Sequence, residues 1–129
     1  MSVACFIPIK ERSTRVPRKN FRLLNGKRLF EYIIDAALES RAFDKVYIDT
    51  DSTEVREYCA SLEQREAISL IDRLPELSKD AANGNDLMKY WLSQYPEYDI
   101  YFQLFATAPF LSSTTIKECV RIMTEDNEH

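Results

Sequence analysis

Positively charged side chains cluster in one short segment near the start of the chain. Residues 9–28 contain eight of the seventeen Lys and Arg residues and a single acid, Glu11. The segment carries a net charge of +7, whereas the whole 129-residue chain carries −4, so the remaining residues sum to −11. A cationic loop between an apolar strand and a helix is where α/β proteins commonly hold nucleotide phosphates. This segment therefore predicts phosphate binding.

The order of residues inside this basic segment favours a shaped loop. Ser13, Thr14 and Asn20 interrupt the cations, while Pro17 fixes its own φ and restricts Val16. A phosphate-binding loop requires a stiff backbone, and a solvated charge run does not. On composition alone, the alternative of an ordinary charged surface loop stays open.

Several other chemistries are excluded by what the sequence lacks. Only two glycines are present, so a G-x-G-x-x-G fingerprint is impossible, and Gly26-Lys27 lacks the upstream glycine of a Walker loop. The single histidine is His129, which argues against a Ser-His-Asp triad or a histidine-rich zinc site. Any catalysis must rest on cations, carboxylates, hydroxyls and backbone amides.

Composition indicates an ordinary cytoplasmic protein with no membrane partner. Hydrophobic residues make up 45% and charged residues 29% of the chain, and no apolar run reaches the length of a membrane span. We expect residues 1–129 to form a single α/β nucleotide-binding domain. The three scattered cysteines, Cys5, Cys59 and Cys119, each fall in an expected strand or helix, which predicts buried thiols in a reducing compartment.

Apolar runs alternate with helical patterns along the whole chain. Strands are expected at residues 3–9, 46–48, 67–71 and 99–104, and residues 73–84 read as a loop. The helices are expected over 29–40, from a capping box of Asp51 and Glu54 to about residue 62, after Asn83 or Asn85, and after Ser112 or Ser113. Their expected inner faces are Leu29, Ile33, Ile34, Ala37 and Leu38; then Leu87, Met88, Trp91 and Leu92; then Ile116, Cys119, Val120 and Met123.

This alternation predicts a Rossmann-like parallel sheet with helices on both faces. A crossing back between the first and fourth strands would create a switch-point crevice at the carboxyl ends of the strands. We expect the basic segment and residues 105–110 to open into that crevice.

Several short motifs occur in order over nearly the whole chain: Ile7-Pro8, Ser13-Thr14-Arg15-Val16-Pro17, Lys19-Asn20, Asn25-Gly26-Lys27, Asp49-Thr50-Asp51-Ser52, Pro75-Glu76-Leu77-Ser78 and Thr107-Ala108-Pro109. Together they resemble one known family, the CMP-sialic acid synthetases (acylneuraminate cytidylyltransferases), with CMP-Kdo synthetases as close relatives. The resemblance implies a fold of the nucleotide-diphospho-sugar transferase type. It also implies that a nonulosonic acid's anomeric hydroxyl attacks the α-phosphate of CTP, using Mg²⁺, to give a CMP-sugar and pyrophosphate.

The resemblance assigns roles residue by residue. Lys19 matches the lysine that holds the triphosphate, and Lys10 replaces a usual arginine, so both are candidate catalytic residues. Arg73 matches an arginine near the cytosine, and Ala82 and Gly84 fall in the turn that faces the base. The expected nucleotide-binding residues are Ile9, Lys10, Arg12, Ser13, Arg15, Lys19, Asn20, Arg73, Ala82, Gly84 and Thr107.

The sequence also departs from the family pattern. Phe105 stands where relatives often carry a glutamine that positions the sugar, Leu111 stands where an arginine is common, and Leu74 replaces a proline. The chain matches the N-terminal half of the family's domain, so we expect a truncated copy or a shortened homologue. The family's homodimer contacts and acidic Mg²⁺ pair lie in the distal half, and Asp49 and Asp51 read as strand-end and cap residues.

Two other functions stay open. A nucleotide-binding fragment without catalysis would keep the basic segment and lack the acidic metal pair. Direct nucleic-acid binding would place four arginines against phosphates: Arg12, Arg15, Arg18 and Arg22. The acidic remainder and the pI near 5.1 argue against nucleic acid as a partner.

Overall fold

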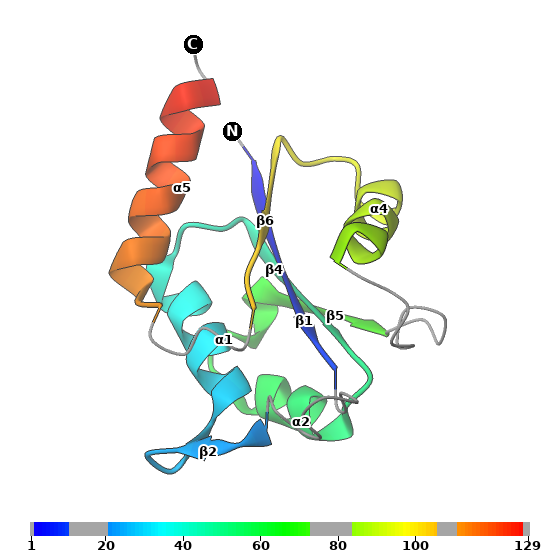
Figure 1. Ribbon diagram of the computed structural model, residues 1–129, viewed down its shortest axis with the longest axis vertical. Coiled ribbons are helices and arrows are strands. Elements are labelled where there is room, and N and C mark those ends of the chain that lie inside the picture. Colours follow the sequence, from blue (N-terminus) through cyan, green and yellow to red (C-terminus); the bar gives the residue numbers. More distant parts are fainter. Residues whose placement is uncertain (1, 11–20, 73–83, 106–110, 128–129) are drawn as a thin grey trace.

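The computed structural model describes residues 2–10, 21–72, 84–105 and 111–127. Its centre is a four-stranded sheet in the order β5-β4-β1-β6, with every neighbouring pair parallel (Figure 1). The strands are β1 (Val3–Ile9), β4 (Lys45–Thr50), β5 (Ile68–Asp72) and β6 (Ile100–Gln103). The helices are α1 (Leu29–Ser40), α2 (Thr53–Ser61), the short 3₁₀ turn η2 (Arg65–Ala67), α4 (Gly84–Gln94) and α5 (Ser113–Asn127). The predicted α/β class and parallel sheet are confirmed.

Strand β1 is central because both of its faces are covered. Cys5, Ile7 and Ile9 point into a core shared with α1, α2 and α5, whereas Ala4 and Phe6 point into a second core under α4. Figure 1 shows α4 on one side of the sheet and α1 and α5 on the other. A strand buried on both faces reads as a continuous apolar run, which is why β1 has the predicted bounds.

The strand order reverses direction beside β1. The chain passes from β1 to β4 and then to β5 on one side, and after α4 it returns to pair β6 with the other side of β1. The carboxyl ends of β1 and β6 therefore flank the switch point that the alternation predicts, and parallel sheets of this kind bind ligands outside such a point.

The second core is dominated by aromatic rings. Phe6 stacks between Tyr47 and Trp91, with both pairs of ring centroids 4.8 Å apart. Trp91 is fully buried, and its indole Nε1 donates a 2.6 Å hydrogen bond to the buried carboxylate of Asp49 at the end of β4. This bond fastens α4 to the carboxyl half of the sheet.

Several details of the predicted helix faces are wrong. In α1 the fully buried residue at the start is Phe30, and Leu29 is only half-buried. Leu92 is 42% exposed and Met123 37% exposed, and Cys119 is also exposed, so only two of the three thiols are buried. Side chains at the edge of a helix's apolar face stay exposed where that face is wider than the surface on which the helix packs.

No helix in the described part of the chain is both long and apolar enough to cross a membrane.

Replacing Trp91 by Phe should destabilise the fold. The substitution keeps a ring against Phe6 but removes the Nε1 donor, which costs the buried Asp49 carboxylate one of its hydrogen bonds. We expect the free energy of unfolding to fall by about 1–3 kcal/mol in urea denaturation followed by circular dichroism. An unchanged free energy would contradict an anchoring role for this bond.

Candidate nucleotide-binding site

The carboxyl ends of β1 and β4 are joined by a buried hydroxyl. Thr50 is fully buried, and its Oγ1 donates a 2.7 Å hydrogen bond to the carbonyl oxygen of Ile9, the last residue of β1. Thr50 Oγ1 also accepts a 3.0 Å hydrogen bond from the backbone N–H of Ser52. The Thr50–Ile9 bond fixes the start of the basic segment, at Ile9, to the neighbouring strand β4.

Helix α2 starts at this fixed point with a cap that differs from the predicted one. Ser52, not Asp51, is the N-cap: it is fully buried, and its Oγ accepts the N–H of Val55 at 3.3 Å. Glu54, the expected partner of Asp51 in a capping box, instead forms an ion pair with Arg28. A buried serine satisfies the helix amide without burying a charge.

The basic segment ends in a small hairpin that the sequence analysis does not predict. Strands β2 (Leu23–Leu24) and β3 (Lys27–Arg28) pair antiparallel around Asn25 and Gly26, whose φ angles are 54° and 83°. Two consecutive positive φ angles define the tight hairpin turn that an Asn-Gly pair favours, so the signal was present in the sequence.

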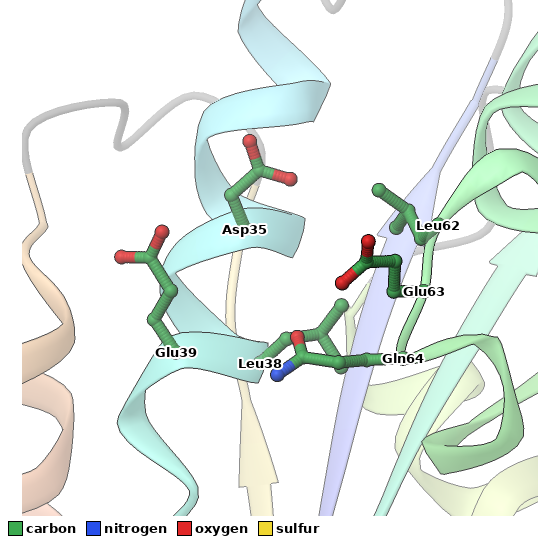
Figure 2. A pocket seen from close by; sticks show the side chains of 6 residues that line it. All are labelled: Asp35, Leu38, Glu39, Leu62, Glu63 and Gln64. Carbon is green, nitrogen blue, oxygen red and sulfur yellow. The ribbon is translucent and has the colours of Figure 1, made fainter.

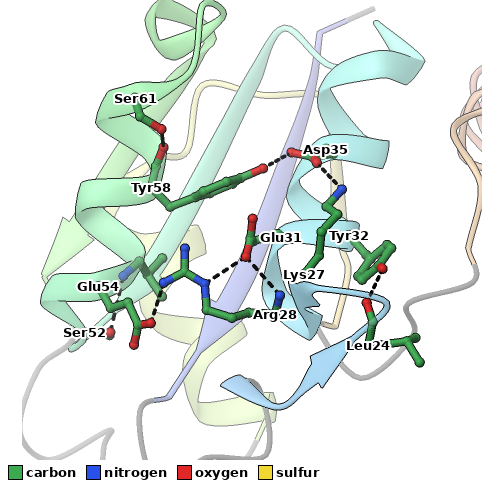
Figure 3. A network of polar contacts seen from close by, with 11 residues as sticks. Leu24, Lys27, Arg28, Glu31, Tyr32, Asp35, Ser52, Glu54, Tyr58 and Ser61 are labelled. Carbon is green, nitrogen blue, oxygen red and sulfur yellow. Dashed lines mark hydrogen bonds and ion pairs between the residues drawn. The ribbon is translucent and has the colours of Figure 1, made fainter.

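Lys27 and Arg28, which lie in the described part of residues 9–28, form ion pairs with acids of the helices (Figure 3). Lys27 Nζ lies 2.7 Å from Asp35 of α1, which also accepts a hydrogen bond from the Tyr58 hydroxyl. Arg28 Nε lies 2.8 Å from Glu31 of α1, and its Nη1 pairs with Glu54 of α2. The hydrogen bond to Asp35 raises the pKa of Lys27. These two side chains hold the hairpin in place, so the surplus charge is not all directed at a ligand.

The structure describes three of the predicted site residues. Ile9 is buried at the end of β1, and Lys10 follows it and is half-buried. Gly84 is the first residue of α4. Through Met88 and Trp91 this helix packs on the face of the sheet opposite to the one that Ile9 faces. Ile9 and Lys10 thus lie together at the carboxyl edge. The other predicted residues lie outside the described part of the chain: Arg12, Ser13, Arg15, Lys19, Asn20, Arg73, Ala82 and Thr107.

Strand β6 brings polar and exposed groups to the other side of the switch point. Gln103 pairs in register with Phe6, and its Nε2 is buried without a hydrogen-bond partner among the residues that the structure describes. Phe105, which stands in place of the family's glutamine, is 51% exposed. An unpaired buried amide is costly, so a hydrogen-bond acceptor at Gln103 Nε2 would stabilise this end of β6.

One surface hollow away from this edge has the wrong charge for a nucleotide. It lies between α1 and the segment after α2 and is lined by Asp35, Leu38, Glu39, Leu62, Glu63 and Gln64 (Figure 2). Three carboxylates there repel phosphate. Within the described residues no three His, Cys, Asp or Glu side chains come together to hold a metal ion, and Asp49 is bonded to Trp91.

The sheet order and the switch point beside β1 define a doubly wound α/β protein with a parallel sheet. The solved structure of CMP:2-keto-3-deoxy-manno-octonic acid synthetase complexed with CTP shares this fold with a TM-score of 0.75 and 20% identity, over 98% of this chain and 49% of that one. Residues 4–129 match the cytidylyltransferase family, and the chain belongs to that family.

Two relatives show how much of such a protein the chain spans. It is 40% identical over 122 residues to an N-acylneuraminate cytidylyltransferase of Streptococcus agalactiae serotype V, covering 93% of this chain and 29% of the relative. It is 33% identical over 122 residues to a pseudaminic acid cytidylyltransferase of Campylobacter jejuni, covering 92% of this chain and 51% of the relative. The chain therefore spans about a third to a half of the length of these relatives.

Stability should fall as the pH rises into the alkaline range. Burial and the nearby Asp35 raise the pKa of Cys59 to about 11, and burial, with a hydrogen bond to Asp35, raises that of Tyr58. In the unfolded chain these groups ionise near their ordinary values, about 8.5 and 10. The folded state therefore keeps its full advantage below about pH 8.5 and loses it progressively above that value.

Urea denaturation at about pH 8 and about pH 10 measures this loss. The free energy of unfolding should be lower at the higher pH, and Tyr58→Phe should reduce the difference between the two values. Equal free energies at both pH values would contradict the buried state of these groups.

Proposed function

We propose that this chain forms the nucleotide-binding part of a cytidylyltransferase. The reaction would join CMP from CTP to a nonulosonic acid, such as an N-acylneuraminate, and release pyrophosphate. The observation that carries the proposal is the 40% identity to an N-acylneuraminate cytidylyltransferase over 93% of the chain. The position of Lys10 at the carboxyl end of the central strand supports it, because that edge is where such sheets bind nucleotides.

In this proposal the basic segment receives the triphosphate. Lys10 and Lys19 would neutralise the phosphates and stabilise charge that develops on the leaving pyrophosphate. Arg12, Ser13, Arg15 and Asn20 would complete the phosphate and nucleotide contacts with Ile9, while Arg73, Ala82, Gly84 and Thr107 would contact the cytidine and the edge of the sugar site. Residues 1–129 would act as one domain, and the full-length enzyme would be a homodimer.

The chemistry requires positioning more than covalent help. A sugar hydroxyl oxygen forms a bond to the α-phosphorus as the bond from that phosphorus to the bridging oxygen of pyrophosphate breaks. The bridging oxygen takes the electron pair, and the hydroxyl proton leaves to water. Cations placed before the reaction lower the energy of such a transition state without having to reorganise.

Mg²⁺ is expected from the family resemblance, and it would offset the charge of the phosphate oxygens. Among the described residues no group of three His, Cys, Asp or Glu side chains could hold a metal ion. By the family resemblance, its ligands would lie mainly in the part of the longer relatives that this chain does not span.

Calorimetric titration with CTP, ATP and GTP in the presence of Mg²⁺ tests the proposal. We expect CTP to bind more tightly than ATP or GTP. Pyrophosphate release when N-acetylneuraminate or Kdo is added would show that these residues suffice for catalysis, whereas CTP binding without release would identify a nucleotide-binding portion. The absence of binding for all three nucleotides would contradict the proposal.

Replacing Lys19 by Ala should weaken CTP binding. Loss of one charge-assisted phosphate contact, of about 1.5–3 kcal/mol, corresponds to a rise in Kd of roughly ten- to a hundredfold. Lys89→Ala makes the same chemical change at an exposed position of α4 and serves as the control. Equal CTP affinity of the two folded variants would remove Lys19 from the site.

A further inference from the structure

The two described parts of the basic segment, its start at Ile9 and Lys10 and the stretch from Phe21 onward, are fixed by different elements of the fold. At the entry, the carbonyl of Ile9 is held by Thr50 of β4. At the exit, Phe21 is buried with its ring centroid 5.2 Å from that of Phe30, and the carbonyl of Arg22 accepts the N–H of Leu29 at 3.0 Å. The exit is thus fastened to the hairpin and to the start of α1.

A chain of contacts also runs from the exit to the first turn of α2. Arg28 of the hairpin pairs with Glu54, a residue 26 positions away that lies two residues beyond the Ser52 cap. Ser52 is in turn bonded to Thr50, which holds Ile9. The contacts Ile9–Thr50–Ser52 and Arg28–Glu54 therefore connect both described parts of the basic segment to the start of α2.

Arg28 is well suited to this bridging contact. Its guanidinium meets carboxylates from two different helices and lies over the ring of Phe30, with Cζ 4.6 Å from the centroid. Its side chain is 24% exposed and that of Glu54 34%, so the pair is partly shielded from water. A planar guanidinium can bond two carboxylates at fixed angles, which a lysine cannot do.

We propose that the Arg28–Glu54 ion pair positions the basic segment for nucleotide binding, which makes both side chains positioning residues. The inference rests on the proposed function. It assigns an acid, Glu54, a favourable effect on the binding of a polyanion. Simple charge repulsion predicts the opposite sign, because removing a carboxylate near a phosphate site should tighten phosphate binding.

The experiment measures the Kd of CTP for the present chain and three variants by calorimetry, with thermal unfolding as the check on folding. Glu54→Gln removes the charge of the pair, and Arg28→Lys keeps the charge but loses the planar fork. Glu57→Gln removes the same charge from an exposed position on the same helix and is the matched control, because the acids that pair with Arg28 are Glu31 and Glu54.

We expect Glu54→Gln and Arg28→Lys to raise the Kd of CTP by about fivefold or more, at the lower end of typical coupling between sites. The control should stay within about twofold of the parent chain or bind slightly more tightly. Equal or tighter binding by folded Glu54→Gln would overturn the inference and leave the proposed function standing. Failure of the unsubstituted chain to bind CTP would instead overturn the proposed function, and this inference with it.

Discussion

The hydrogen bond from the Thr50 hydroxyl to the Ile9 carbonyl is the contact on which the site depends. It ties the buried carboxyl ends of β1 and β4 together, and the same Thr50 hydroxyl accepts the N–H of Ser52 at the start of α2. The residue after Ile9 begins the most cationic segment of an acidic chain. A buried strand, a hydroxyl and a helix start therefore define where that positive charge enters the edge of the sheet.

Charge in residues 9–28 serves two purposes. Lys27 and Arg28 are committed to Asp35, Glu31 and Glu54, and these pairs hold a hairpin against two helices. Partly exposed ion pairs contribute modestly to stability, so their main consequence is geometric. The acids of α1 and α2 thereby fix one end of a segment whose other cations, in the proposed function, contact phosphate.

Sequence reasoning predicted the strands and most helix positions because buried parallel strands and amphipathic helices leave strong apolar periods, as in β1 and α1. Sequence reasoning does not predict side-chain contacts between residues that are far apart in the chain. Glu54 was assigned to a local capping box but pairs with Arg28, and nothing in the spacing of residues 49–52 revealed that Thr50 bonds Ile9. The Asn25-Gly26 pair is a typical hairpin-turn sequence, but the sequence analysis treats these residues as part of one basic loop. Of the candidate site, the placement of Ile9 and Lys10 followed from the strand pattern, whereas the residue roles came from family resemblance.

The most direct test of this account is the Thr50→Val variant, which keeps the shape of the side chain and removes its hydroxyl. It should lower the free energy of unfolding by about 1–3 kcal/mol, because the Ile9 carbonyl and the Ser52 N–H lose a buried partner. Under conditions where the variant is still folded, it should also bind CTP more weakly than the parent chain. Unchanged stability together with unchanged CTP affinity would contradict the claim that this contact sets the position of the site.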